Sequence, residues 1–399
     1  MTAGTMAVTR GAVAARPVGW AAVALGAIAW YITLPPLTVR TPVPSLLLAL
    51  AAVTAGALAV RGEERRLGWW GVVAGVLGGA GAVVATESGV GNLEDVFVWS
   101  ALVAAMLRFA TPLVFGALGG IICERSGVIN IGLEGMMLMG AFFGIFGADL
   151  TGSWWLGVLI GMGSGGALAL IHALFSIQFR ADQVVSGFAM NLLALGITGY
   201  VFIAHYGDQG TPDDISRVPV VTLPGIEDIP FVGDAIGRAS LLTWLALLLV
   251  PLLALYLFRT PRGLRLRSVG EKPRAADSVG VPVIRTRYLA VVASGLLAAL
   301  GGVYLSIAFL GSFSQNLTAG RGYIALAAVI FGAWRPAGAL AAALLFGFSS
   351  ALAQRLPAFS ESTAVLFQAL PYVLTLIVVA GLIGRTRPPA AIGVPYVKE

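Results

Sequence analysis

The sequence has few charged residues. They make up 11% of its 399 positions, whereas roughly a quarter of the residues in soluble domains are charged. Hydrophobic residues make up 58%, and the mean hydropathy is +0.90. A chain this apolar cannot bury its hydrophobic surface in a water-soluble core, so it must contact lipid. This composition excludes soluble enzymes, disordered chains, coiled coils and nucleic-acid-binding proteins.

Residues that usually build catalytic or metal sites are also scarce. The only cysteine, Cys123, excludes an intrachain disulfide. Lys272 and Lys398 are the only lysines, and neither lies in a G-x-x-x-x-G-K-[ST] phosphate-binding loop. The two histidines, His172 and His205, do not belong to a cluster with metal-ligand spacing. We therefore expect no catalytic residue, no metal and no cofactor in this chain.

Long hydrophobic runs, by contrast, follow one another along the whole sequence. A membrane-spanning helix needs about 20 apolar residues, and twelve runs approach this length. We therefore predict an all-α, polytopic transmembrane helix bundle with about 10–12 spans. Residues 116–135 combine many glycines with Glu124 and Glu134, which predicts a broken or re-entrant segment. The runs cover 18–38, 43–60, 67–86, 96–118, 128–150, 154–178, 184–206, 239–258, 288–310, 320–334, 337–354 and 364–384.

Basic residues are distributed unevenly among the loops between these runs. With the N-terminus inside, most of the 25 Lys and Arg residues lie on the cytoplasmic side. The distribution predicts that both termini are cytoplasmic, and it explains the net charge of +6 without a nucleic-acid partner. Residues 1–34 begin like a signal peptide, but no small-residue cleavage site follows them, so we expect a retained helix.

Six polar residues lie in or beside the hydrophobic runs. Polar groups at membrane depth are costly, so they either line a solute path or bond to the backbone of a broken or neighbouring helix. For Glu134 the second role means accepting hydrogen bonds from backbone amides. The uncharged side chains fit an uncharged, polyhydroxylated solute, and they fit contacts between helices equally well. The candidates are Asn130, Glu134, Gln183, Asn191, Thr198 and Asn316.

The inner loop 259–287 carries eight of the basic residues. Pro273 is suited to start a short helix there, and Gly280 is suited to end it. A short helix at the cytoplasmic face can dock into a partner protein. The alternative is a solvated basic loop that only sets the orientation of the chain, and the residues alone do not decide between the two.

Four segments, in this order, resemble one known family closely: 119–141, 181–198, 260–281 and 314–336. Residues 124–141 read Glu-Arg-Ser-Gly-Val-Ile-Asn-Ile-Gly-Leu-Glu-Gly-Met-Met-Leu-Met-Gly-Ala, and residues 259–276 read Arg-Thr-Pro-Arg-Gly-Leu-Arg-Leu-Arg-Ser-Val-Gly-Glu-Lys-Pro-Arg-Ala-Ala. They resemble the permease subunits of bacterial ABC importers for simple sugars, nucleosides and branched-chain amino acids, most of all the nucleoside and simple-sugar branch. The resemblance covers roughly 100–384.

The resemblance implies a role for the inner loop. Loop 259–287 would contact a separate cytosolic ABC ATPase, which would use ATP on behalf of this chain. The further partners implied are a second, similar permease and an extracytoplasmic solute-binding protein or lipoprotein, with the chain itself a multi-pass protein of the bacterial plasma membrane. The implied coupling residues are Arg265, Gly270, Glu271, Lys272, Pro273, Arg274, Ala275, Ala276 and Gly280.

The resemblance also implies three parts of the chain and a substrate class. Residues 1–95 would be accessory helices, 96–384 the permease core, and 385–399 a cytoplasmic tail. Few charges in the spans favour a neutral solute, and the branch favours nucleosides over the alternatives of simple sugars and branched-chain amino acids. An ion-coupled secondary carrier is the other alternative, but it usually has paired intramembrane carboxylates, whereas here Glu134 has only Arg108 as another buried charge.

Overall fold

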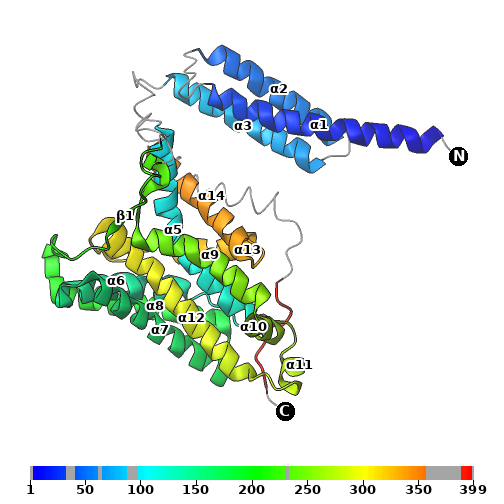
Figure 1. The fold of residues 1–399 in the computed structure, drawn as a ribbon. Coiled ribbons are helices and arrows are strands. Elements are labelled where there is room, and N and C mark those ends of the chain that lie inside the picture. Colours follow the sequence, from blue (N-terminus) through cyan, green and yellow to red (C-terminus); the bar gives the residue numbers. More distant parts are fainter. Residues whose placement is uncertain are drawn as a thin grey trace. The chain divides into compact units, whose positions relative to one another are not determined.

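The computed structural model describes residues 3–32, 41–61, 65–87, 98–229, 233–355 and 388–397. The chain divides into two compact units. Met1–Leu102 and Leu352–Leu382 form the first, and Val103–Ala351 and Ile383–Glu399 form the second. Helices make up nearly all of the regular structure, as Figure 1 shows. The all-α prediction is therefore confirmed.

Three helices pack against one another in the first unit: α1 (Ala3–Tyr31), α2 (Pro42–Arg61) and α3 (Arg65–Glu87). Glycines at four-residue spacing on α3 make this packing close. A Cβ atom on Gly71 would meet the side chain of Ala22, and one on Gly75 would come within 2.9 Å of the Ala49 carbonyl oxygen. In lipid the hydrophobic effect does not drive helices together. Small residues instead stabilise helix pairs by letting their backbones pack closely.

The second unit is built around α6 (Leu133–Thr151) and α12 (Val283–Val303), which pack against each other and against α7 (Trp154–Ala173). About 78% of the apolar window is buried in α6 and in the span that contains α12, compared with 28% in α8 (Gln183–Tyr206) and α9 (Leu241–Arg259). The remaining helices are α5 (Trp99–Arg125), α10 (Pro261–Glu271), α11 (Pro273–Ser278), α13 (Arg321–Phe331) and α14 (Pro336–Arg355).

Short irregular elements complete this unit. π-helical turns continue α7 at Leu174–Gln178 and α12 at Tyr304–Leu310, and a third covers Gly233–Gly237. The 3-10 turn Gly207–Gln209 follows α8. Strands β1 (Val220–Thr222) and β2 (Arg238–Ser240) pair antiparallel, with Val221 opposite Ala239.

Eight helices in the described part of the chain are long and apolar enough to cross a membrane, and Pro17–Tyr31, Leu67–Gly81 and Arg321–Phe331 are shorter apolar helices. The run 364–384 lies outside the described residues. The expected break in 116–135 is narrower than predicted. Residues 116–125 continue α5 and α6 begins at Leu133, so the non-helical part is 126–132.

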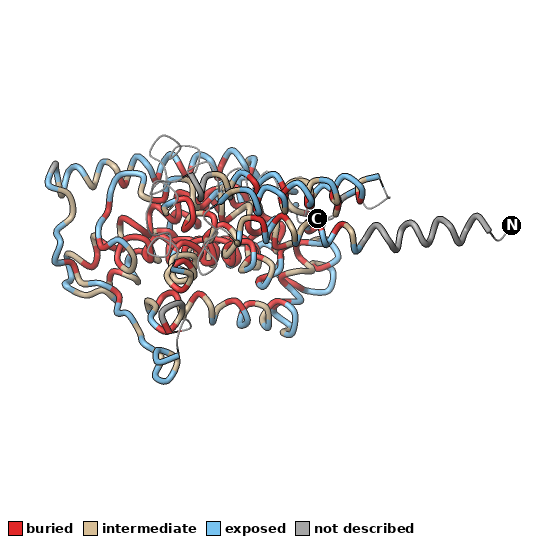
Figure 2. Tube along the Cα trace, turned by 90° about the horizontal axis from the view of Figure 1, so that it is seen from above, coloured by how far each residue is buried: buried red, intermediate tan, exposed pale blue. Residues whose placement is uncertain are grey.

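The outer face of α8 shows how the second unit meets its surroundings. Val185, Phe188, Leu192 and Tyr200 are exposed large hydrophobic side chains. Apart from Met190, the buried positions of the same helix are small or polar. The buried positions are Gln183, Ser186, Gly187, Met190, Asn191, Ala194 and Thr198. In Figure 2 buried and exposed stretches alternate along single helices in the same manner. This apolar exterior is the arrangement that lipid requires.

Candidate functional site

Loop 126–132, the break between α5 and α6, is held by polar side chains from neighbouring helices. The Ile129 amide donates to Gln183 Oε1 at 2.7 Å, and the Ile129 carbonyl lies 3.1 Å from His172 Nε2. Asn191 Nδ2 donates to the Ile131 carbonyl at 3.0 Å. These side chains replace the backbone partners that the loop lacks, as buried irregular backbone requires.

Asn191 links this break to the beginning of α13. Its Oδ1 accepts from the Gly135 amide at 2.7 Å, and its Nδ2 also donates to the Tyr323 hydroxyl at 2.9 Å. One amide therefore connects α8, α6 and α13. We call the side chains of this region the polar cluster: Asn130, Glu134, His172, Gln183, Asn191 and Tyr323.

Glu134 lies in the first turn of α6 and binds the turn that precedes α13. Its Oε1 accepts from the Thr318 hydroxyl at 2.6 Å and from the Gly320 amide at 2.8 Å, and its Oε2 accepts from the Gly322 amide at 2.5 Å. Backbone amides at a helix start carry partial positive charge, so they stabilise a carboxylate. The geometry agrees with the expected role of bonding to the amides of a broken helix.

Two buried atoms of the polar cluster have no hydrogen-bond partner among the described residues. Asn130 Nδ2 donates to Ser294 Oγ at 3.0 Å, but its Oδ1 is buried without a partner, as is Gln183 Nε2. Within the described residues these are a free acceptor and a free donor beside one loop. Both are uncharged, so they suit the hydroxyl or amide groups of a neutral molecule.

Thr198 and Asn316 are not part of this arrangement. Thr198 is buried, but its hydroxyl donates to the Ala194 carbonyl of its own helix at 2.7 Å. Asn316 is exposed in the loop before α13, with φ of 57°. Tyr323 belongs to the polar cluster and Ser294 accepts from its Asn130, but neither was among the sequence-based candidates. Tyr323 follows the Gly-Arg-Gly turn, whereas Ser294 gives no signal beyond a hydroxyl within an apolar run.

The inner loop 259–287 contains two helices rather than one. The hydroxyl of Thr260 caps α10 by accepting from the Gly263 amide at 3.1 Å, and Pro261 occupies the first turn. The expected helix at Pro273 is present as α11, and Gly280 follows it with φ of 82°. Most of the implied coupling residues are exposed here: Arg265, Glu271, Lys272, Arg274, Ala275 and Gly280, with Pro273 half-buried and Gly270 and Ala276 buried.

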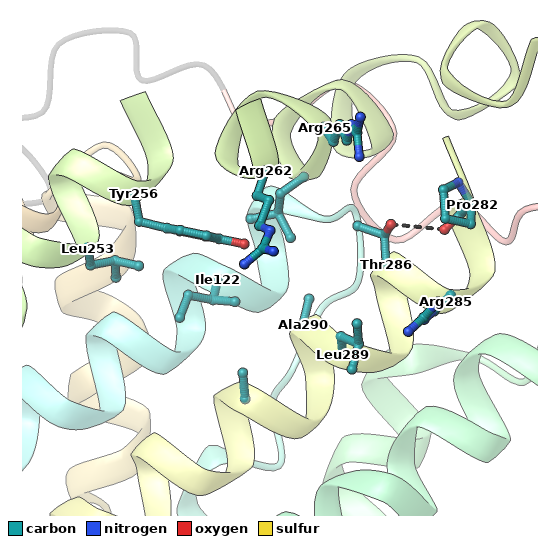
Figure 3. Close-up of a pocket in the computed structure, with 12 residues that line it drawn as sticks. Ile122, Leu253, Tyr256, Arg262, Arg265, Pro282, Arg285, Thr286, Leu289 and Ala290 are labelled. Carbon is teal, nitrogen blue, oxygen red and sulfur yellow. Dashed lines mark hydrogen bonds between the residues drawn. The ribbon is translucent and has the colours of Figure 1, made fainter. Parts of the chain in front are cut away.

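A cavity of about 700 Å³ lies beside α10 and is shown in Figure 3. Arg262 projects into it towards Tyr256 and Ile122, and Arg265 and Arg285 are also among its lining residues. Three guanidinium groups make this cavity positively charged, unlike the polar cluster with its neutral amides. One of the implied coupling residues, Arg265, therefore belongs to the wall of this cavity.

Two basic residues lie differently from the sequence-based expectation. Arg108 is exposed rather than buried, because it lies on the outer side of α5 and donates to the Ala104 carbonyl of its own helix. Arg287 belongs to α12 and is only 2% exposed. It donates through Nε to the Ser126 carbonyl at 3.2 Å and through Nη1 to the Val394 carbonyl at 3.0 Å.

The C-terminal end of α5 is bound to the turn after α13. The Trp334 indole donates to the Glu124 carboxylate, and Arg125 Nη2 donates to the Trp334 carbonyl at 3.0 Å. The two adjacent charged residues thus hold the same tryptophan. Among the described residues, no three His, Cys, Asp or Glu side chains are placed to hold a metal ion.

The chain has clear relatives among transport proteins. The sequence model of a family described as branched-chain amino acid transport system / permease component matches residues 102–379. The guanosine ABC transporter permease protein NupQ of Bacillus subtilis is 43% identical over 317 residues, which are 77% of this chain and 99% of that protein. The nucleoside ABC transporter permease protein NupC of Lactococcus lactis subsp. cremoris is 39% identical over 308 residues, or 75% and 97% of the two chains.

A putative glucose ABC transporter permease protein, TsgC13 of Haloferax volcanii, is 41% identical over 258 residues, or 64% of this chain and 77% of its own. No solved structure matches the chain. The matched region contains loop 126–132, the polar cluster and helices α10 and α11. The protein is thus an ABC transporter permease of the bacterial plasma membrane and crosses it several times, and it is a transport component rather than an enzyme. The chain belongs to the family of permease components typified by branched-chain amino acid transport systems.

Proposed function

We propose that the chain forms the translocation path for nucleosides in an ATP-driven importer. The polar cluster supports a neutral solute, because it offers uncharged amide and hydroxyl groups and its one carboxylate accepts three hydrogen bonds from protein donors. A nucleoside carries several neutral donors and acceptors of this kind. Two of the relatives are named for guanosine and for nucleosides, which points to the same class.

The strongest support for this proposal is that Asn130 Oδ1 and Gln183 Nε2 have no hydrogen-bond partner among the described residues. Both atoms are buried beside loop 126–132, where the backbone is already held by other side chains. A buried polar atom without a partner costs free energy, so a passing solute that bonds to it is stabilised at that point. Asn191 and Glu134 then position the loop and the start of α13 rather than contact the solute. Thr198 and Asn316 are the remaining candidates for the path, outside the polar cluster.

The importer is driven by a separate cytosolic ATPase that docks on α10 and α11. The exposed charged residues of these two helices form a polar surface. Val279 directly follows α11, is 77% accessible, and adds an apolar contact at one end of this surface. The docking residues are Arg265, Gly270, Glu271, Lys272, Pro273, Arg274, Ala275, Ala276 and Gly280. A second permease subunit and an extracytoplasmic solute-binding protein complete the complex.

Transport by the reconstituted complex tests the substrate. Proteoliposomes that contain the permease with its ATPase, partner permease and binding protein should take up radiolabelled guanosine and other nucleosides only when ATP is supplied to the ATPase. Glucose and leucine in excess should not compete. Competition by glucose would favour the simple-sugar alternative, because the Haloferax relative is named a putative glucose permease. Uptake with a hydrolysis-deficient ATPase would reject the importer.

A pair of matched substitutions tests the docking surface. Val279→Asp places a charge on the exposed apolar end of α11, whereas Val220→Asp makes the same change at a 65% exposed position on β1. We expect Val279→Asp to reduce ATPase co-purification at least tenfold and Val220→Asp to leave it unchanged. Equal retention of the ATPase by both variants would contradict the docking surface.

A further inference from the structure

The C-terminal segment 388–397 lies against the cytoplasmic helices. Figure 1 shows it, in red, running beside α10 and α11. The Ala391 amide donates to the Gly270 carbonyl at the end of α10, at 2.9 Å. The Ala390 amide donates to Glu271 Oε2 at 3.2 Å. Two successive residues of the tail thus bind the junction between the two helices.

The same segment also binds the loop at the inner end of α5. The Gly393 amide donates to the Gly127 carbonyl at 3.1 Å, and the Val394 carbonyl accepts from Arg287 Nη1 at 3.0 Å. Arg287 in turn donates to the Ser126 carbonyl. The buried guanidinium of Arg287 therefore clamps the tail to the first residue of loop 126–132.

Side-chain packing supports these backbone contacts. Tyr396 packs on a small apolar cluster that is separate from the main core of the unit. Ala391 is buried to 8% exposure. The cluster joins α10, α11 and the start of α12, and its buried members are Val269, Ala276, Val281 and Val283.

Two glycines make room for this arrangement. A Cβ atom on Gly127, whose φ is 90°, would come within 2.9 Å of Arg287 Nη2 and 3.1 Å of the Ala391 carbonyl oxygen. A Cβ atom on Gly270 would meet the Arg125 carbonyl oxygen. Only residues without a side chain allow the tail, α10 and the end of α5 to meet this closely.

We propose that residues 388–397 form a strap that transmits movement of α10 and α11 to loop 126–132. The inference rests on the proposed docking of the ATPase on these helices. When the ATPase displaces the junction of α10 and α11, Ala390 and Ala391 move with it. The strap transmits this movement through Gly393 to Gly127. From Gly127 the loop leads within a few residues to Ile129, which binds Gln183 of the polar cluster. The strap is thus a positioning element for transport and contacts neither solute nor ATP.

A permease that lacks residues 388–399 but is otherwise unaltered tests the strap directly. In the permease alone, hydrogen exchange should become at least tenfold faster across 261–280 and 126–132, because both segments lose the tail that packs on them and binds their carbonyl groups, and so open more often. In the complete transporter, ATP hydrolysis should continue while solute uptake per ATP falls about tenfold. Unchanged exchange in both segments would overturn the strap.

Two adjacent alanines provide matched point variants. Ala391→Gln places a longer side chain where the tail is buried, whereas Ala390→Gln changes an exposed side chain and keeps the amide that binds Glu271. We expect Ala391→Gln to reproduce the deletion and Ala390→Gln to behave as the unaltered protein. Identical behaviour of the two variants would contradict the proposed contact.

The two readouts separate this inference from the proposed function. Faster exchange in 261–280 with unchanged uptake per ATP means that the tail holds α10 and α11 but does not transmit their movement. The strap then fails as a transmission element, whereas the docking proposal is still decided by Val279→Asp. Unchanged exchange, together with loss of the ATPase in Val279→Asp, leaves the docking proposal standing and removes the strap alone.

Discussion

Glu134 is a carboxylate whose hydrogen-bonding capacity is used by its own protein. A charged group at membrane depth is costly unless it is paired or hydrogen-bonded. Here three donors from one turn surround it, and two of them are backbone amides beside the start of α13. The residue thereby joins two helices that are far apart in the sequence.

Removing this carboxylate should destabilise the protein. Glu134→Ala leaves three buried donors without an acceptor, and we expect it to lower the free energy of unfolding by about 3 kcal/mol. Glu134→Gln keeps one acceptor oxygen and should cost less. Denaturant titration in mixed micelles measures both, with Gln315→Ala at an exposed position as the control. Equal stability of Glu134→Ala and Gln315→Ala would show that the three contacts carry no net free energy.

The sequence indicated which polar residues lie within spans, but not how they pair. Asn130, Glu134, Gln183 and Asn191 were recognised because polar groups stand out in apolar runs, and the structure brings them together. Thr198 and Asn316 had the same signal but lie elsewhere. The partners Ser294 and Tyr323 come from helices distant in the sequence, and no local pattern specifies such contacts.

At the scale of helices, glycine faces set how closely α7 approaches α6 and α12. Gly157, Gly161 and Gly165 lie on one side of α7 and meet atoms of these two helices. The four-residue spacing places these glycines on one face, and α7 uses this face to pack within the chain. Gly163 lies on the other side, where a Cβ atom would have no neighbouring atom within 4 Å.

These glycines provide a matched pair of variants. Gly161→Ala would place a Cβ atom 2.8 Å from the Gly140 carbonyl oxygen and 2.9 Å from the Gly144 Cα atom, whereas Gly163→Ala meets open space. We expect the first to lower the free energy of unfolding by about 1–3 kcal/mol and the second to be neutral or slightly stabilising. Thermal unfolding in detergent compares the two. A Gly161→Ala protein as stable as Gly163→Ala would mean that α7 can shift freely.

Helix boundaries with a local signal were predictable, and those without one were not. Pro273 and Gly280 bracket α11 as expected, and glycines marked the break before α6. Helix α10 was not foreseen, because arginines mask its apolar positions Leu266 and Val269. The binding site for the tail is also invisible in the sequence, because it depends on backbone groups of Gly127 and Gly270 that no side-chain pattern reveals.

At the scale of the whole molecule, the family match begins where the N-terminal part of the first unit ends, although that unit also contains Leu352–Leu382. The family model begins at residue 102, and the first unit contains Met1–Leu102. NupQ aligns over 99% of its own length with only 77% of this chain. We therefore expect the permease core to be complete without the first three helices.

Deletion of residues 1–95 should accordingly leave transport intact. We expect the shortened permease to insert, to bind its ATPase and to show ATP-dependent uptake within about twofold of the full chain. Uptake in proteoliposomes measures this, with the strap deletion as a variant that inserts but is uncoupled. Failure of the shortened protein to insert would show that α1–α3 are needed for folding of the core.

The neutral character of the polar cluster has an electrical consequence. Its carboxylate is held by three protein donors, and the proposed nucleoside solute is uncharged, so its passage should move no net charge across the bilayer. Each elementary charge moved would otherwise cost or gain about 2.3 kcal/mol per 100 mV. Uptake should therefore be the same in vesicles clamped at zero and at inside-negative voltage. Uptake driven by a separate ATPase, as proposed, would then not depend on the membrane potential.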